Sequence, residues 1–297
     1  MKIGMKELKE RVAKAYSLLE DCTVCPRKCR VNRLKGEMKF CGIGREAVVS
    51  SFAPHFGEEP PLIGSYGSGT IFFAGCNLLC SFCQNYDISH AREGRTSSGE
   101  EVAAMMIALE RLGCHNINFV SPTHVTPQIL MAILIARDNG LTVPLVYNCG
   151  GYESVETLKL LDGIIDIYMP DIKYSDPNVA EELSSAPDYP AVSRSALKEM
   201  HRQVGDLVID SLGRAKSGLL IRHLVMPGGK AGTEEVMKFI ATEISMDSYV
   251  NIMDQYRPCY HAHLTKEIDR RITSQEYSQA IGIALRCGLH RGFERYV

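Results

Sequence analysis

The sequence predicts an α/β fold built from parallel strand–helix units. From residue 70 to the end, six short apolar segments alternate with amphipathic helical segments, which is the pattern of parallel β–α units. Each apolar segment is followed by polar or glycine-rich residues, as expected where a site forms at the carboxyl ends of parallel strands. An open partial barrel of six units fits this pattern better than a doubly wound sheet, although the pattern alone does not decide between them.

The composition is that of a globular protein with a sizeable core. Of the 297 residues, 45% are hydrophobic and 23% are charged, and the formal net charge is -2. This charge gives no global attraction to nucleic acid or membranes, so neither is expected as a partner. No apolar run approaches the roughly 20 residues that span a bilayer, and residues 1–6 lack the apolar core of a signal peptide. A cytoplasmic location is therefore expected.

The predicted elements follow one another at short intervals. An amphipathic helix covers residues 5–20, with Leu8, Val12 and Leu19 on one face. Strands are predicted at residues 71–74, 116–120, 143–147, 164–169, 219–226 and 249–253. Helices are predicted at residues 100–112, 127–139, 154–161, 190–211, 233–245 and 273–287.

Four cysteines follow the N-terminal helix at the spacing C-x2-C-x3-C-x11-C: Cys22, Cys25, Cys29 and Cys41. Cysteines this close together in a cytosolic protein are more often metal ligands than disulfide partners. Four thiolates suit either a tetrahedral zinc ion or an iron–sulfur cluster, and spacing does not separate the two. A second metal site is therefore predicted here, with zinc and iron–sulfur both open.

The segment that carries these four cysteines is basic. A zinc knuckle that contacts nucleic acid has such a charge, but no aromatic residue interleaves with the cations before Phe40. A solvated surface, or a surface that faces an acidic protein, is the favoured interpretation. The cations are Arg27, Lys28, Arg30, Arg33, Lys35, Lys39 and Arg45.

Residues 50–69 are rich in Gly, Pro and Ser and are interpreted as a linker over the surface. The chain is therefore divided into an N-terminal helix and four-cysteine metal-binding extension, residues 1–65, and a main domain, residues 66–297.

A second group of cysteines follows the first predicted strand of the main domain. Cys76, Cys80 and Cys83 have the spacing C-x3-C-x2-C, directly after Gly75. Three thiolates on one loop can ligate three irons of a cubane cluster and leave the fourth iron open, while a structural zinc ion is the alternative. The spacing and its setting resemble those of the radical S-adenosylmethionine (radical SAM) enzymes, which bind S-adenosylmethionine (SAM) at the open iron of a 4Fe-4S cluster. The resemblance implies that the main domain is a partial barrel. It also implies that Cys76, Cys80 and Cys83 are catalytic residues.

The strand ends carry groups that suit this cofactor. Asn148 and Asp171 are acceptors for the amine and the ribose hydroxyls of SAM, whereas Arg222 or Lys173 suits its carboxylate, Arg222 through a bidentate fork. An ordinary surface ion pair is the alternative for Asp171 and Lys173. Cys114, Cys149 and Cys287 are expected to be small buried hydrophobic residues, with Cys149 the exception to examine because it lies at a strand end.

The sequence resembles one branch more closely, that of the pyruvate formate-lyase-activating enzyme. Gly75-Cys76-Asn77-Leu78 and Cys83-Gln84-Asn85 match the cluster loop of that branch. The resemblance implies that Phe82 packs near the adenine. It also implies that Asp171-Ile172-Lys173 matches the fourth-strand Asp-Leu-Lys motif, and that Arg222 approaches the cofactor from the fifth strand.

Two features depart from that branch. Its second strand usually ends in Gly-Gly-Glu-Pro, which holds the methionine amine, whereas residues 121–124 here are Ser-Pro-Thr-His. Thr123 is the candidate contact at this position, and His124 is either a cofactor or substrate contact or a loop histidine. Extra cysteines in activating enzymes usually follow the cluster loop, whereas here they precede it, as in one subgroup of activating-enzyme-like proteins.

The resemblance implies an oxidoreductase that reductively cleaves SAM to a 5′-deoxyadenosyl radical, which abstracts hydrogen from a substrate. A protein or peptide substrate of the glycyl-radical-enzyme-activating type is expected, with a reductant such as flavodoxin or ferredoxin. Modification of a small molecule or of another side chain is an alternative. A metal-stapled binding or electron-transfer protein without radical chemistry is an alternative of another class.

Overall fold

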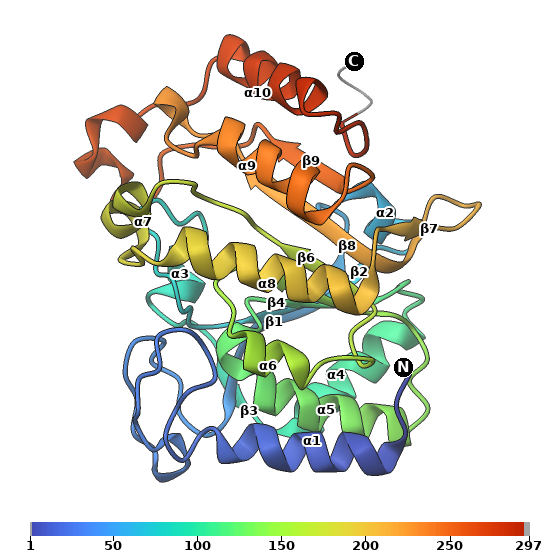
Figure 1. Cartoon of the computed structure of the whole chain (residues 1–297). Coiled ribbons are helices and arrows are strands. Elements are labelled where there is room, and N and C mark those ends of the chain that lie inside the picture. The colour runs from blue at the N-terminus through green and yellow to red at the C-terminus, as the bar shows by residue number, and fades with distance from the viewer. Residues whose placement is uncertain (1, 294–297) are drawn as a thin grey trace.

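Six parallel strands form the centre of the structure, a computed structural model that describes residues 2–293 (Figure 1). Each of these strands pairs with the next one in the chain, apart from the short antiparallel strands inserted elsewhere. The predicted partial barrel of six βα units is therefore confirmed. The strands are β2 (Ser68–Phe73), β4 (Ile117–Val120), β5 (Leu145–Cys149), β6 (Ile167–Pro170), β8 (Ala215–Leu224) and β9 (Tyr249–Met253).

The segment interpreted as a linker is part of the sheet, so that interpretation is wrong. β1 (Ala47–His55) pairs antiparallel with β2, and β3 (Arg95–Ser97) pairs with the other edge of β1. The sequence of β1 misled because its second half is largely exposed and lacks the apolar run of a buried strand. A third antiparallel strand, β7 (Val208–Ile209), lies at the edge of β8.

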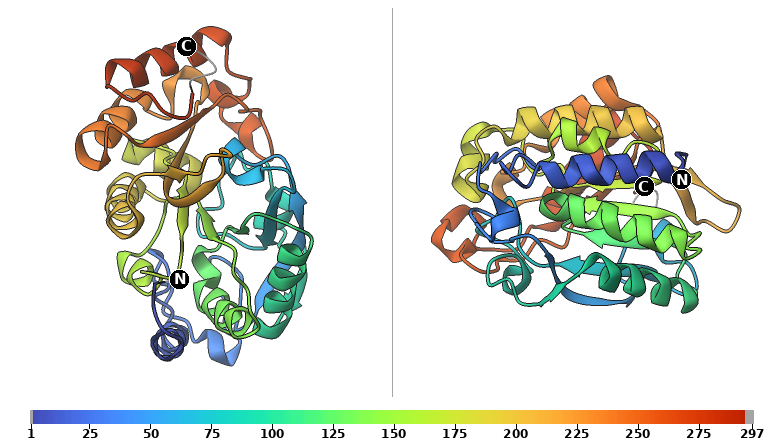
Figure 2. Two further views of the ribbon diagram at one scale, coloured as in Figure 1. Left: turned by 90° about the vertical axis from the view of Figure 1, so that its right-hand side faces the viewer. Right: turned by 90° about the horizontal axis from the view of Figure 1, so that it is seen from below.

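The helices that connect the parallel strands cover the outside of the sheet (Figure 2). Their boundaries agree with the predicted ones except that α7 was not predicted and that Gly205 ends α8, where β7 takes the residues that follow. Capping boxes begin α4 at Ser98 and α10 at Thr273. The longer helices are α1 (Met5–Ser17), α4 (Gly99–Arg111), α5 (Thr126–Asp138), α6 (Val155–Lys159), α7 (Pro177–Ser184), α8 (Tyr189–Val204), α9 (Thr233–Phe239, continued by a π-turn, Ile240–Ile244) and α10 (Ser274–Arg286).

Short helical turns occupy the connections and strand ends. They are α2 (Pro60–Ile63), α3 (Tyr86–Ser89) and the 3-10 turns η1 (Arg33–Lys35), η2 (Thr123–Val125), η3 (Pro227–Gly229), η5 (Ala262–Leu264) and η6 (Lys266–Ile268). Among the described residues, no helix combines the length and the apolar character needed to cross a membrane.

The main core fills the space between the sheet and its helices. Ile71, Phe119 and Tyr147 reach it from the strands, and Met106 and Ile133 reach it from α4 and α5. The N-terminal helix α1 packs on α5, so it extends this core rather than standing apart (Figure 2). Its residues Leu8, Val12 and Ala15 are buried there. The partial barrel is thus rigid on its outer face, and the carboxyl ends of the strands are held at one edge.

Candidate active site

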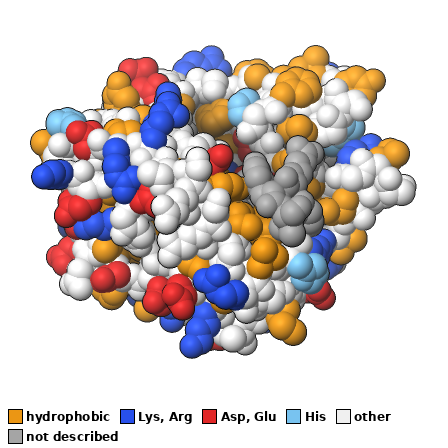
Figure 3. Space-filling view, turned by 90° about the horizontal axis from the view of Figure 1, so that it is seen from above, with side chains coloured by type: hydrophobic (Ala, Val, Ile, Leu, Met, Phe, Trp, Pro, Cys, Tyr) orange, Lys and Arg blue, Asp and Glu red, His pale blue; other side chains and the backbone are white. Residues whose placement is uncertain are grey.

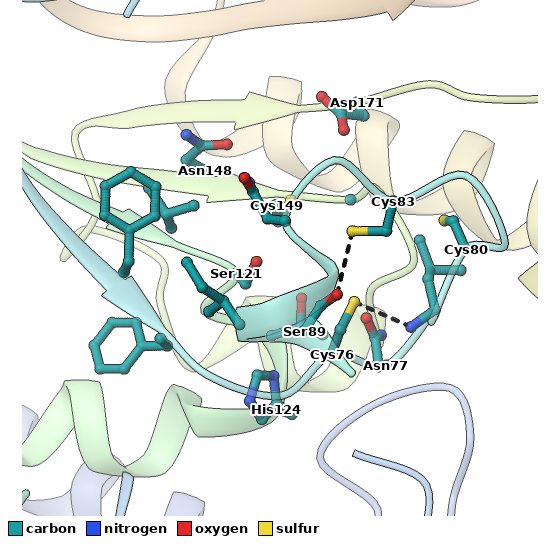
Figure 4. A pocket seen from close by; sticks show the side chains of 18 of the residues that line it. Cys76, Asn77, Cys80, Cys83, Ser89, Ser121, His124, Asn148, Cys149 and Asp171 are labelled. Carbon is teal, nitrogen blue, oxygen red and sulfur yellow. Dashed lines mark hydrogen bonds between the residues drawn. The ribbon is translucent and has the colours of Figure 1, made fainter. Parts of the chain in front are cut away.

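One cavity lies at the carboxyl ends of β2, β4, β5, β6 and β8 (Figure 4). All three cysteines of the loop after β2 line it, and polar residues from the other strands line the remaining wall. The structure thus brings together eight of the sequence-predicted site residues. They are Cys76, Cys80, Cys83, Thr123, Asn148, Asp171, Lys173 and Arg222.

Each of the three thiols has a hydrogen-bond partner. The backbone N–H of Leu78 donates to Cys76 Sγ over 3.3 Å, and the Ser89 hydroxyl lies 3.2 Å from Cys83 Sγ (Figure 4). The Ser184 hydroxyl donates to Cys80 Sγ over 3.0 Å. Donors aimed at sulfur stabilise thiolates, which are the form that ligates iron.

Burial favours the protonated form of the Cys76 and Cys83 thiols as long as no cation binds them. Burial raises the pKa of Cys76 to about 11, and burial also raises the pKa of Cys83 above its usual value. Within residues 2–293, no three side chains of His, Cys, Asp or Glu converge on a position for a single metal ion. Three thiols around one cavity fit a multi-iron cluster with an open iron.

A network of buried charges faces the three thiols across the cavity. Arg222 Nε donates to Asp171 Oδ1 over 2.8 Å, and Arg222 Nη2 donates to Asn148 Oδ1 over 2.8 Å. Lys173 Nζ donates to the second carboxylate oxygen of Asp171 over 2.6 Å. The Asp171 and Lys173 side chains are 15% and 17% exposed, so they are not an ordinary surface ion pair.

The charges in this network stabilise one another. Burial alone would raise the pKa of the Asp171 carboxyl, but the Arg222 and Lys173 cations outweigh it and hold the pKa below its usual value. Burial lowers the pKa of Lys173, but the Asp171 carboxylate and the Cys80 thiol together raise it above its usual value. Arg222 and Lys173 thus place two cationic groups at the cavity wall, and such groups suit a carboxylate ligand.

A second buried carboxylate, that of Glu59, contacts this network through Arg222. Glu59 Oε1 lies 3.6 Å from Arg222 Nη1 and accepts a hydrogen bond of 3.1 Å from Asn251 on β9. Glu59 precedes α2, in the segment interpreted as a linker, and no sequence pattern predicted it as a site residue. Burial raises the pKa of its neighbour Glu58. Arg222 is therefore held by groups from α2, β5 and the end of β6.

Behind Thr123 lies a carboxyl that sequence reasoning missed. Thr123 Oγ1 donates to Glu153 Oε1 over 2.5 Å, and the Tyr147 hydroxyl donates to Glu153 Oε2 over 3.0 Å. Burial raises the pKa of Glu153 to about 8. A carboxyl thus stands next to the strand end where Gly-Gly-Glu-Pro would be expected, but it comes from the loop after β5 and acts through Thr123.

The imidazole ring of His124 is buried and hydrogen-bonded. Its Nε2 pairs with the Ala74 carbonyl over 2.8 Å, and burial lowers the pKa of the imidazole to about 4. The ring lines the cavity and joins the end of β4 to the start of the cysteine loop (Figure 4). It is neutral near pH 7 and positions the loop.

Some predicted residues lie elsewhere. Phe82 is not part of the cavity wall among the described residues; its ring packs 5.9 Å from Tyr256 and 6.5 Å from Tyr174. Cys149, the strand-end exception among the cysteines expected to be buried, is buried, lines the cavity and hydrogen-bonds Glu153. The four N-terminal cysteines also lie outside this cavity wall, and their metal site stays a prediction. They are Cys22, Cys25, Cys29 and Cys41.

Comparison with known proteins agrees with this geometry. Residues 70–240 match the model of the radical SAM superfamily. The uncharacterized protein MJ0674 of Methanocaldococcus jannaschii is 33% identical over 97% of this chain and 81% of its own length. A second uncharacterized protein of that organism, MJ0808, is 30% identical over 55% of this chain and 53% of its own length.

A solved structure shares the fold. HydG, a maturase of the FeFe-hydrogenase, superposes with a TM-score of 0.51 at 14% sequence identity, over 97% of this chain. The match covers 62% of HydG, so this chain spans less than two thirds of that protein. On the extent of the family match and of the likeness to MJ0674, the chain belongs to the radical SAM superfamily, whose members use a 4Fe-4S cluster and SAM.

Proposed function

We propose that this radical SAM enzyme abstracts hydrogen from a protein or peptide, as glycyl-radical-activating enzymes do. When bound, the cluster and SAM supply a 5′-deoxyadenosyl radical, once a low-potential carrier such as flavodoxin or ferredoxin has delivered an electron. The observation that carries the proposal is the cavity in which Cys76, Cys80 and Cys83 face the Asp171–Arg222 network.

The residues of the cavity have separate roles in this proposal. The three cysteines hold the cluster and leave one iron open. Arg222 and Lys173 bind the SAM carboxylate, and Asn148 accepts from its amine or ribose, since these groups offer matching charge and hydrogen-bond capacity. Thr123, held by Glu153, takes the place of the amine contact at the end of β4.

The substrate class rests on the resemblance of the cysteine loop. Gly75-Cys76-Asn77-Leu78 and Cys83-Gln84-Asn85 match the loop of the pyruvate formate-lyase-activating branch, and Asp171-Ile172-Lys173 resembles its fourth-strand motif. Fold likeness alone does not favour this class over another, because one fold supports many reactions. The second candidate is modification of a small molecule or of another side chain.

The test begins with the cofactor chemistry. The full chain is reconstituted anaerobically with iron and sulfide, then given dithionite and SAM, and 5′-deoxyadenosine is measured. We expect product from the wild-type chain and none from Cys76→Ala, with Cys287→Ala as the matched cysteine control. A fully loaded wild-type cluster that yields no 5′-deoxyadenosine would contradict the proposal.

The substrate class needs a second measurement. Peptides that contain glycine deuterated at the α-carbon are added to the same reaction, and deuterium in 5′-deoxyadenosine is measured by mass spectrometry. Transfer of deuterium supports hydrogen abstraction from a peptide glycine. Enhanced 5′-deoxyadenosine formation with a small-molecule extract, together with no transfer from any peptide, favours the second candidate.

A further inference from the structure

The four N-terminal thiols form a group apart from the active-site cavity. Cys22 and Cys25 are each 6% exposed, Cys29 and Cys41 are half-buried, and all four are free thiols. Burial raises the pKa of Cys25 to about 12, and the Cys41, Cys22 and Cys29 thiols add to this effect, which places all four within electrostatic reach of one another. We name residues 22–46, which contain them, the cysteine lobe.

The backbone of the lobe folds back on itself around Cys29. The Cys22 N–H donates to the Val31 carbonyl over 3.0 Å, and the Arg30 N–H returns a bond of 3.1 Å to the Cys22 carbonyl. Lys28 and Arg30, on either side of Cys29, have φ values of 41° and 59°. Left-handed conformations cost non-glycine residues about 1–2 kcal/mol each and are concentrated at ligand sites.

A buried arginine gives independent evidence of a missing anion. Arg33 is 1% exposed, and it donates to the Gly44 carbonyl over 3.0 Å and to the His124 carbonyl over 2.7 Å. Its Nη1 lies 4.0 Å from Cys22 Sγ, and its Nη2 has no hydrogen-bond partner among the described residues. None of the ion pairs found there includes Arg33. Since a buried guanidinium without a counter-charge is strongly destabilising, an anionic group is expected beside Arg33 on the side of Cys22.

Zinc and a cluster would use the same four thiolates. Within residues 2–293 no three candidate ligands are found at the position of one metal ion, either in the lobe or at Cys76, Cys80 and Cys83, where the family binds a cluster. This likeness of the two cysteine groups favours a cluster over zinc, and the iron, sulfide and zinc analysis below distinguishes the two.

We propose that Cys22, Cys25, Cys29 and Cys41 bind a second 4Fe-4S cluster with all four irons ligated by protein, and that Arg33 is its buried counter-charge. Four thiolates around such a cluster are net negative, which supplies the anion that Arg33 lacks. Because no iron is left open, this cluster does not bind SAM. The proposal does not depend on the substrate class.

The lobe shares a wall with the active-site loop. A Cβ on Gly75, whose φ is +80°, would lie 2.7 Å from the Cys41 carbonyl oxygen, so only glycine allows this approach. Arg27 Nε donates to the Asn77 carbonyl over 2.9 Å, and Arg33 contacts His124, which lines the cavity. The second cluster would therefore lie directly beside the loop that holds the first.

The test counts iron, sulfide and zinc in variants of the full chain. Each protein is unfolded, stripped of metal and refolded anaerobically with iron, sulfide and equimolar zinc, then desalted. A Cys76→Ala, Cys80→Ala, Cys83→Ala variant retains about four iron and four sulfide per chain, half of the wild-type content. Adding Cys25→Ala and Cys41→Ala to that variant should remove this remaining iron and sulfide. One zinc without sulfide in the three-substitution variant, or no metal at all, overturns the proposal.

A second variant keeps the proposal testable if the variants above fail to fold. Cys22→Ala with Cys25→Ala keeps the active-site cysteines and should lose half of the wild-type iron while its circular dichroism still shows a folded barrel. Retention of the full wild-type iron content by this variant would refute the proposal. The matched control is Cys114→Ala with Cys287→Ala, which removes two thiols outside both groups and should leave the iron and sulfide content unchanged.

Arg33→Met tests the counter-charge in the three-substitution variant, where the second cluster is the only one. Loss of the nearby cation makes the reduced cluster less stable, so its midpoint potential, followed by electron paramagnetic resonance, should become more negative. Lys28→Met, at an exposed position of the same lobe, is the comparison and should have a smaller effect. An equal shift in both variants would remove the assigned role of Arg33.

Discussion

The Arg222 side chain contacts residues from three other segments of the active site. It is on β8, yet it bonds Asn148 at the end of β5, Asp171 after β6 and Glu59 before α2. Each guanidinium nitrogen faces a different acceptor, and the side chain is 18% exposed, at the cavity wall. A planar fork held from three sides has little freedom left to lose when it binds a carboxylate.

Replacement of Arg222 should therefore weaken SAM binding. In Arg222→Met the Asp171 carboxylate keeps only Lys173, and the carboxylate of SAM loses its bidentate partner. We expect about 10- to 100-fold weaker binding of SAM to the reconstituted enzyme, measured by equilibrium titration. Arg222→Lys retains the charge without the fork and should fall between wild type and Arg222→Met. Equal affinity in all three proteins would exclude Arg222 from the SAM site.

Glu153 should make stability depend on pH. Its folded-state pKa of about 8 is above its unfolded value, so between about pH 5 and pH 8 the unfolded chain binds fewer protons than the folded one. The free energy of unfolding should then fall as pH rises through this window, by up to about 4 kcal/mol from this carboxyl. Urea unfolding at pH 5.5 and pH 8 checks this. Glu153→Gln should lose much of the difference, and an unchanged pH dependence would contradict the expectation.

At the scale of elements, the C-terminal end of α7 supports the cysteine loop. The Leu183 carbonyl accepts from the Ser81 N–H over 2.8 Å, and the Ser184 hydroxyl donates to Cys80 Sγ. Ser184 in turn is bonded by the Tyr174 hydroxyl over 2.8 Å. A helix that follows the fourth parallel strand thereby orients a thiol that follows the first.

Removal of this contact should change the electronic properties of the cluster without removing it. The hydrogen bond from Ser184 to Cys80 stabilises the reduced cluster, which is more negative than the oxidised one, by roughly 1 kcal/mol. The Ser184→Ala variant loses this bond. The midpoint potential should become more negative by about 40 mV, with unchanged iron content, in a redox titration followed by electron paramagnetic resonance. Ser195→Ala on the exposed face of α8 is the matched control. An unshifted potential in Ser184→Ala would show that this bond is absent from the loaded enzyme.

The elements also show what the sequence could and could not predict. The six parallel strands and their helices follow from local apolar patterns, and the residues at the strand ends follow from chain order. β1 exposes much of its second half and so lacks a continuous apolar run, and no local pattern marks it as a strand. Glu153 and Ser184 act on the site only through tertiary contacts, and their residue types are common in loops and helix ends.

At the scale of the whole molecule, the cysteine lobe and the barrel are one packed unit. Figure 3 shows cations and anions interspersed on the upper face, with no large area of one sign. Within the lobe, however, two of the cations interpreted as solvated are engaged with the protein. Arg33 is buried, and Arg27 bonds carbonyls of the cysteine loop and of the α7 end. The basic composition of this segment thus serves partly to attach it to the barrel.

Loss of Arg27 should loosen the lobe. Its guanidinium donates to the carbonyls of Asn77, Ser184 and Ser185, and it lies 3.8 Å from the ring centroid of Phe40. Arg27→Met should lower the free energy of unfolding by about 2 kcal/mol and speed cleavage of the lobe by a lysine-specific protease. The lysines of the lobe are untouched by this change and by the control Arg45→Met, which removes an exposed arginine 3.5 Å from Glu46. If both variants are cleaved at the wild-type rate, the Arg27 contacts do not hold the lobe on the barrel.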